Sequence, residues 1–282
     1  TGVVNKLQRM LGLKVPDRLL PYCRVPEAER PVVFLTHMEH HSNQTSWLET
    51  LCDVEILEPD AQGLVDPGAL EEALQRHRGR PRKIGAFTAC SNVTGIVTPY
   101  RELARAMHRH GGVCFVDFAA SAPYVPIDMH PEGDPEAALD AVYFSPHKFL
   151  GGPGTPGVLV FDSGLYHNRV PDQPGGGTVL WTNPWHQHSY IRDIEVREDG
   201  GTPAFLQTFR AALAVRLKEA MDPDRMRQRE EQLLAVLLPG LKAIDGLHLL
   251  AGQHERRQGI LSFYLDGLHY NLVVRLLNDR FG

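Results

Sequence analysis

Short apolar runs alternate with longer amphipathic runs along much of the chain, and this alternation is typical of β-α-β units that build a mostly parallel sheet. The expected strands are Val32–Thr36, Val54–Leu57, Ile84–Thr88, Val113–Asp117, Ala141–Ser145 and Gly157–Phe161. The expected helices between them are Asn43–Leu51, Pro67–His77 and Pro99–His110. The pattern predicts a doubly wound α/β sheet, and in such sheets ligands bind at the carboxyl ends of the strands.

The second part of the chain departs from this alternation. Residues Pro171–Pro203 contain three consecutive glycines and few periodic apolar positions, so they predict a long loop of the kind that is often functional. Five further elements are expected: a helix at Ala204–Met221, then, after a joint at Asp222-Pro223, a second helix, two strands at Leu247–Leu250 and Ile260–Leu265, and a closing helix at Tyr270–Arg280. We therefore expect a large domain over residues 1–221 and the start of a small α+β domain over residues 222–282.

Composition excludes several classes of protein. The 282 residues carry a formal net charge of -5 and no basic run, which argues against a nucleic-acid or anionic-membrane partner. No apolar stretch of membrane-spanning length and no signal-peptide pattern is present, so a cytoplasmic protein is expected. The four cysteines form no C-x-x-C pair and predict neither a disulfide framework nor a zinc ribbon. Because the chain begins at Thr1 and ends at "LLNDRFG", we expect it to be a segment of a longer protein.

Lys148 is the strongest candidate for chemistry. It follows the strand Ala141–Ser145 directly and precedes a glycine-rich turn, in "SPHKFLGGP". A lysine at a strand end in a closed crevice can lose its proton and form a Schiff base. Ser145 and His147 beside it are hydrogen-bond donors suited to a phosphate. A surface lysine in an ordinary loop is the alternative.

Asp117 ends the strand Val113–Asp117, which comes before the strand that leads to Lys148. A carboxylate there can pair with a protonated pyridine nitrogen and keep a cofactor ring an electron sink. The alternative role is that of a helix-capping aspartate. An aspartate at one strand end and a lysine at the next favour the cofactor.

His40 lies in "MEHHSN", just after the strand Val32–Thr36. Its imidazole can lie flat against a pyridine ring and later move protons to or from a substrate. A metal site formed by His37, His40 and His41 is disfavoured, because no further ligand has a suitable spacing. We therefore predict no metal.

Five motifs, "MEHHSNQTSW", "TACSNVTG", "VCFVDFAASAPYVPID", "AVYFSPHKFLGGPGTPG" and "EDGGTP", occur in the order and spacing of the class V aminotransferases. The sequence most resembles the cysteine desulfurase and selenocysteine lyase branch of that family. The resemblance covers residues 1–221 strongly and the rest weakly. It implies the fold of a fold-type I enzyme, a three-layer αβα large domain with a mostly parallel sheet, and the cofactor pyridoxal 5'-phosphate.

The resemblance also implies roles for individual residues. Lys148 matches the lysine of the internal aldimine, Asp117 the partner of the pyridine nitrogen, and His40 the histidine that stacks on the ring. Phosphate ligands are matched by Ser145 and His147. The other cofactor-binding residues are implied by the resemblance alone: Asn92 near the cofactor hydroxyl, Thr1 and Gly2 at a helix start that binds the phosphate, and Thr202 reaching the phosphate of a neighbouring subunit. A homodimer with shared active sites is thereby implied.

Two departures from the family pattern bear on function. Where the desulfurases have a glutamine three residues after the aspartate, this chain has Ala120. None of the four cysteines, Cys23, Cys52, Cys90 and Cys114, matches the catalytic cysteine, which together with a carboxylate-binding arginine belongs to the small domain beyond Gly282. The leading hypothesis is a lyase acting on a small amino acid, of desulfurase type. An aminotransferase or epimerase on the same scaffold and a non-catalytic cofactor-binding interaction protein are the alternatives.

Overall fold

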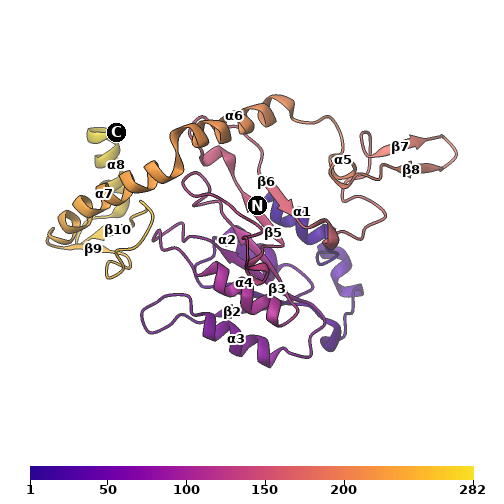
Figure 1. Ribbon diagram of the computed structural model, residues 1–282, viewed down its shortest axis with the longest axis horizontal. Coiled ribbons are helices and arrows are strands. Elements are labelled where there is room, and N and C mark those ends of the chain that lie inside the picture. The colour runs from indigo at the N-terminus through magenta and orange to yellow at the C-terminus, as the bar shows by residue number, and fades with distance from the viewer.

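The computed structural model describes all 282 residues and has a six-stranded sheet at its centre (Figure 1). The strands lie in the order β2-β1-β3-β4-β5-β6, and all neighbouring pairs are parallel except β5 and β6. Their bounds are β1 Val32–Thr36, β2 Asp53–Leu57, β3 Lys83–Thr88, β4 Val113–Asp117, β5 Ala141–Phe144 and β6 Val158–Phe161. The mostly parallel sheet predicted from the sequence is confirmed, and β6 is its antiparallel edge.

Helices cover both faces of this sheet. They are α1 Gly2–Met10 and α2 His41–Leu48 on one face, with α3 Pro67–Arg76 and α4 Tyr100–Arg109 on the other. Successive residues of β1 point to opposite faces: Val32 and Phe34 pack in the core with α3 and α4, whereas Val33 and Leu35 pack in the core with α1 and α2. Because both faces are covered, the strands are apolar at nearly every position and the three-layer αβα arrangement results.

Residues 171–203 differ from the long loop expected there. They contain a two-stranded antiparallel hairpin, β7 Val179–Thr182 with β8 His188–Tyr190, and a short helix α5 Ile194–Glu198. The hairpin extends away from the sheet (Figure 1), and Trp181 and Trp185 in it are exposed. Because the hairpin packs no apolar face against the core, its sequence lacks the alternation by which strands are recognised.

The C-terminal residues form a separate small layer beyond helix α6 Phe205–Met221. The chain turns at Asp222, whose φ is 61°, and continues as α7 Pro223–Lys242. The strands β9 Leu247–Leu249 and β10 Phe263–Leu265 form an antiparallel pair, followed by α8 Tyr270–Phe281. The order of elements expected after Met221 is confirmed, while the division into domains at residues 221 and 222 stays a prediction.

A tight turn follows β5 and carries Lys148. The turn is a short 3-10 helix over Pro146–Lys148, and the chain then folds back so closely that Gly152 touches it. A Cβ atom at Gly152 would lie 1.8 Å from the carbonyl oxygen of Pro146. The backbone path around Lys148 therefore requires glycine at this position.

We expect Gly152→Ala to destabilise the protein by ~1–3 kcal/mol, because the added methyl group forces backbone atoms apart. Urea unfolding measures the change. Gly79→Ala is the matched control, since nothing lies within 4 Å of a Cβ there, and its change should stay within about 0.5 kcal/mol. Equal stability of the two variants would contradict this account of the turn.

Candidate active site

A cavity of about 210 Å³ lies at the carboxyl ends of β1, β3, β4 and β5. Most of the site residues predicted from the sequence line it: Thr1, His40, Asn92, Asp117, His147 and Lys148. They come from five separate segments, because in a parallel sheet the segments that follow the strands meet at one edge. The fold thus brings together side chains that are spread over nearly 150 residues of the sequence.

Three predicted residues do not line the cavity. Gly2 and Ser145 adjoin it, since Gly2 follows Thr1 at the start of α1 and Ser145 precedes the turn that carries His147. Thr202 is exposed, and it does not cap α6, whose N-cap is Ala204 without any side-chain hydrogen bond. The structure therefore removes the capping role as an explanation for Thr202.

Asp117 is the buried charge of the site. Its side chain is 7% exposed, and one carboxylate oxygen, Oδ1, accepts a hydrogen bond of 2.8 Å from the backbone N–H of Ala119. Burial raises the pKa of Asp117, while the Ala119 N–H and the charge of Lys148 act in the opposite direction. The Oδ2 oxygen takes part in no hydrogen bond within the chain, so it can accept a hydrogen bond from a donor group of a molecule in the cavity.

Lys148 and His147 line the cavity but are exposed to solvent. Neither side chain makes a hydrogen bond or ion pair within the chain, so the ammonium group of Lys148 is available to a ligand. The closed crevice expected around Lys148 is not formed by these residues. Lys148 stands on the short turn after β5, where its side chain faces solvent at the cavity rim.

His40 caps the first turn of α2 with its ring. The Nδ1 atom accepts a hydrogen bond of 3.1 Å from the backbone N–H of Ser42, so in the neutral ring the proton sits on Nε2. Burial lowers the pKa of His40, and the nearby His41 and Lys148 lower it further. A neutral imidazole that cannot accept a second proton at Nδ1 without losing its cap is therefore held at the cavity.

The start of α1 provides an anion site beside these groups. Thr1, Val3 and Val4 line the cavity, and no side chain caps the helix. The free N–H groups of a first helical turn and the helix dipole both favour an anion such as a phosphate. The donor set of α1, His147 and Lys148 and the acceptor Asp117 therefore suit a ligand with an anionic group and a protonated ring nitrogen.

Sequence reasoning missed a polar network behind the cavity. The Glu39 carboxylate accepts hydrogen bonds from Thr36, Thr88 and Asn43, and Asn43 in turn accepts one of 2.6 Å from the hydroxyl of Tyr143, which lines the cavity. Glu39 and Asn43 lie inside the motif that yielded His40. No helical spacing revealed the pair, because Glu39 precedes His40, the N-cap of α2, while Asn43 lies in the first turn of that helix.

A second missed feature supports Asn92. The loop Ser91–Gly95 is held by the C-terminal residues: Arg257 donates to the carbonyl oxygen of Thr94 at 3.0 Å, and Ser262 donates to that of Val93 at 2.6 Å. Arg257 is only 7% exposed and has no carboxylate partner. More than 150 residues separate these partners, so no local pattern could reveal the contact.

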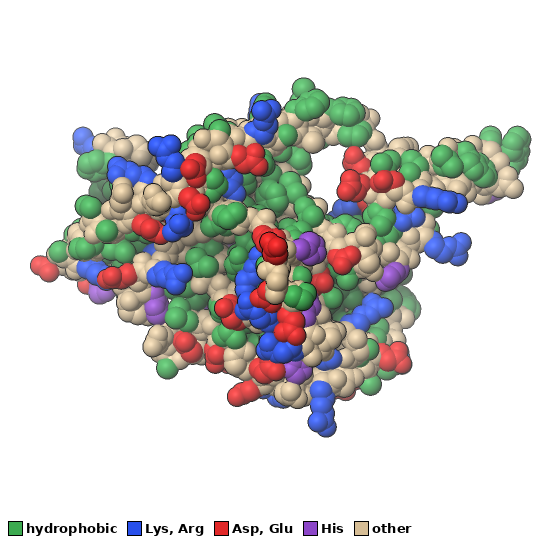
Figure 2. Space-filling model, viewed as in Figure 1, with side chains coloured by type: hydrophobic (Ala, Val, Ile, Leu, Met, Phe, Trp, Pro, Cys, Tyr) green, Lys and Arg blue, Asp and Glu red, His purple; other side chains and the backbone are tan.

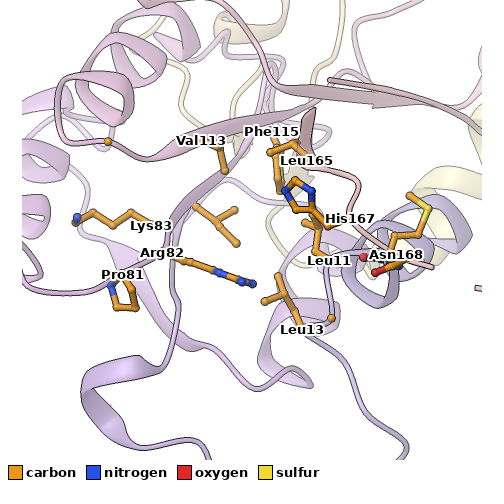
Figure 3. Close-up of a pocket in the computed structure, with 14 residues that line it drawn as sticks. Leu11, Leu13, Pro81, Arg82, Lys83, Val113, Phe115, Leu165, His167 and Asn168 are labelled. Atoms are coloured by element: carbon orange, nitrogen blue, oxygen red, sulfur yellow. Dashed lines mark hydrogen bonds between the residues drawn. The ribbon is translucent and has the colours of Figure 1, made fainter. Parts of the chain in front are cut away.

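The other cavities and side-chain clusters of the molecule contain fewer groups suited to chemistry. A larger cavity of about 380 Å³ lies at the opposite ends of β3 and β4, where Arg82 extends into it and Lys83 turns away (Figure 3). That cavity contains none of the predicted residues and no carboxylate. The chain has no group of three or more His, Cys, Asp or Glu side chains placed to hold a metal ion. None of its helices is both long enough and apolar enough to span a membrane.

Comparison with known proteins identifies the family of this chain. Residues 23–282 match the family model described as aminotransferase class V. The chain is 31% identical over 250 residues to the probable cysteine desulfurase 2 of Mycobacterium leprae, covering 88% of this chain and 57% of that protein. It is 27% identical to a probable cysteine desulfurase of Halalkalibacterium halodurans, covering 91% and 61%.

Solved structures share the fold. The crystal structure of the cysteine desulfurase CsdA from Escherichia coli has a TM-score of 0.74 and 26% identity, and the match covers 89% of this chain and 60% of that one. The chain thus spans less than two thirds of the length of these relatives. The match over nearly all of its residues, together with the shared fold, shows that this chain belongs to the class V aminotransferase family.

Proposed function

We propose that this chain builds the pyridoxal 5'-phosphate site of an enzyme that acts on a small amino acid, most similar to a cysteine desulfurase or selenocysteine lyase. The observation that carries the proposal is the pairing of Asp117, buried with one free oxygen, with the unpartnered Lys148 in a single cavity. A buried carboxylate needs a cation, and a protonated pyridine nitrogen is one. The family and the names of the relatives agree with this assignment.

The residues at the cavity fit this cofactor. The first turn of α1 and His147 would bind its phosphate, and Ser145 beside His147 would add a hydroxyl donor. Asn92 would approach the ring hydroxyl, and the imidazole of His40 would face the ring. Lys148 would hold the cofactor covalently. The cavity of about 210 Å³ is small, which suits a single planar ring with its phosphate.

When bound, pyridoxal 5'-phosphate supplies an electron sink for negative charge that develops at the substrate α-carbon. Asp117 would keep the proton on the pyridine nitrogen. The amine of Lys148 would take the proton from the substrate α-carbon and later return it. His40, with its single ring proton on Nε2, would act as a donor toward the substrate.

A desulfurase also needs a thiolate that takes up the sulfur. Cys90 is the only cysteine that lines the cavity, and burial raises its pKa to about 12, so it stays a protonated thiol at neutral pH. We therefore place the sulfur acceptor outside these residues. An aminotransferase or epimerase needs no such thiol, and Ala120 at the cavity in place of a glutamine keeps this second function open.

A non-catalytic binding protein is disfavoured by the same residues. Binding alone would need the phosphate donors of α1 and His147, whereas Lys148 and Asp117 serve the electron sink. We also propose a cytoplasmic location, because all four cysteines are unpaired, as is usual in a reducing compartment.

The partner in the proposed assembly is a second copy of this chain. Leu206, Phe209 and Leu213 of α6 are each at least 64% exposed, and they share one face of the helix. Figure 2 shows apolar side chains gathered over α6 and over the hairpin, where Trp181 and Trp185 are also exposed. An apolar surface of this kind usually belongs to an interface. The exposed Lys148 would be covered if a second subunit docked here.

We expect Lys148→Ala to remove the absorption band that the covalent lysine–cofactor link gives near the edge of the visible range. The fold should be retained, because the exposed side chain makes no contact on which packing depends. Absorption spectra before and after borohydride reduction, with far-UV circular dichroism, provide the measurement. A borohydride-reducible band that persists in this variant would refute the role of Lys148.

Asp117→Ala should slow exchange of the substrate α-hydrogen by about 100-fold or more, roughly 2.7 kcal/mol of barrier, because the ring nitrogen loses its carboxylate. Cofactor binding should fall far less, since the phosphate contacts remain. Proton NMR of L-alanine in deuterated water measures exchange without any side-chain elimination. Asp66→Ala is the matched control, because Asp66 likewise accepts a backbone N–H two residues on, at 2.8 Å, but lies outside the cavity. Unchanged exchange in the Asp117 variant would make this residue structural.

Thr202 tests the shared site. We expect Thr202→Ala to weaken cofactor retention by about tenfold, roughly 1.4 kcal/mol, through loss of a hydrogen bond to the phosphate of the neighbouring subunit. Hybrid dimers of the Thr202→Ala and Lys148→Ala chains then contain one site with both native residues. Titration of borohydride-reducible cofactor should show native affinity in that site. If the hybrids stay as weak as Thr202→Ala alone, Thr202 does not serve the other subunit.

A further inference from the structure

Glu39 occupies a central position directly beside His40, although it does not line the cavity. Its Oε1 atom accepts hydrogen bonds from the hydroxyl of Thr36 at 2.7 Å and from the backbone N–H of Thr88 at 2.8 Å. Its Oε2 atom accepts one of 2.7 Å from the side chain of Asn43. One carboxylate thus joins the end of β1, the end of β3 and the first turn of α2.

The orientation of Asn43 is fixed by its other partners. Its Oδ1 atom accepts from the indole N–H of Trp47 at 3.2 Å and from the hydroxyl of Tyr143 at 2.6 Å. Because an indole can only donate, Oδ1 must face Trp47 and the amide NH₂ must face Glu39. Asn43 and Trp47 are fully buried, so no water can replace these bonds without disrupting the core. The network therefore requires an acceptor at position 39.

The charge state of Glu39 fits such a role. Burial raises the pKa of Glu39 to about 7, although Asn43, Thr36 and Thr88 lower it and the negative charge of Asp117 raises it further. The carboxylate form accepts a hydrogen bond from every donor that points at it. In the protonated form the carboxyl O–H would face one of these donors, and that hydrogen bond would be lost. Near its pKa of about 7 both forms are populated, and the carboxylate form is the one that satisfies the donors from all three elements.

His40 depends on this arrangement. Its ring reaches the cavity from the residue next to Glu39, and its Nδ1 atom is held by the backbone N–H of Ser42 in the same first turn of α2 that Asn43 anchors. We propose that Glu39 is a positioning residue: by tying β1 and β3 to α2, its carboxylate holds the imidazole of His40 at the cavity in the Nε2-protonated form. The importance of this for catalysis rests on the proposed function, whereas the positioning itself does not.

The test is a pH titration of His40 in the Glu39→Gln variant. NMR of ring-labelled histidine monitors the titration in the purified protein, with and without cofactor. Glutamine keeps the shape but turns an NH₂ group toward a donor, so the tie to α2 should open. We expect the His40 pKa to rise toward its ordinary value of about 6.5 and the Nε2-protonated fraction to fall. The His40→Gln spectrum assigns the signal.

Ser46→Ala is the matched control. It removes a buried hydrogen bond of 3.0 Å between Gln8 and the same helix α2, but does not touch Glu39. Its His40 titration should stay as in the parent protein, even where stability falls. A shift of equal size in this control would show that His40 responds to any loosening of α2 and would overturn the proposal.

Thr36→Val keeps the experiment decisive if Glu39→Gln does not fold. It preserves the side-chain shape and removes one donor to Glu39, together with the 3.2 Å hydrogen bond that the Thr36 hydroxyl accepts from the backbone N–H of Met38, so a smaller shift in the same direction is expected. A folded Glu39→Gln protein, or a folded Thr36→Val protein in its absence, with an unchanged His40 titration would overturn the positioning role. Because the cofactor-free protein is measured as well, failure of the cofactor assignment would leave this result unaffected.

Discussion

The burial of a carboxylate at the end of β4 is the constraint on which the site depends. β4 lies between β3 and β5 in a sheet covered on both faces, so Asp117 at its carboxyl end is removed from water. Such a charge is costly unless hydrogen bonds and a cation compensate for it. The chain supplies one backbone N–H and the nearby charge of Lys148, and leaves one oxygen free. In the proposed function, a ring with a protonated nitrogen would complete the compensation.

A second buried polar group, Glu39, lies behind the cavity and is connected through Asn43 to Tyr143, which lines it. Burial raises the pKa of both Glu39 and Tyr143, the negative charge of Asp117 raises both further, and each of the two is hydrogen-bonded to Asn43. A buried polar network is stable only if all its members find partners. Here the donors of Thr36, Thr88 and Trp47 satisfy it, and in doing so they fix the strand ends that carry the site.

The sequence predicted those parts of the fold whose side chains face a core. The strands at Val32–Thr36 and Val113–Asp117 have the predicted bounds, because burial on both faces demands continuous apolar runs. The prediction of a long loop over residues 171–203 was wrong. The hairpin there exposes Trp181 and Trp185, so its sequence lacks the apolar alternation that marks a half-buried strand. Asp117 and Lys148 could be predicted because they follow strands, whereas Thr1 and Asn92 came from the family resemblance alone. The contact between Arg257 and the loop that carries Asn92 joins distant segments, and Lys148 is exposed instead of enclosed.

The exposure of Lys148 and the apolar face of α6 have a common physical interpretation. An amine that must lose its proton requires an environment poorer in water than the open cavity, and α6 presents apolar side chains with nothing over them. Both requirements are met if another surface docks on α6 and closes the cavity. Thr202 lies just before the same helix, and its side chain is free for the contact with a neighbouring subunit that we propose. Closure of the site and recognition of the phosphate would then follow from one interface.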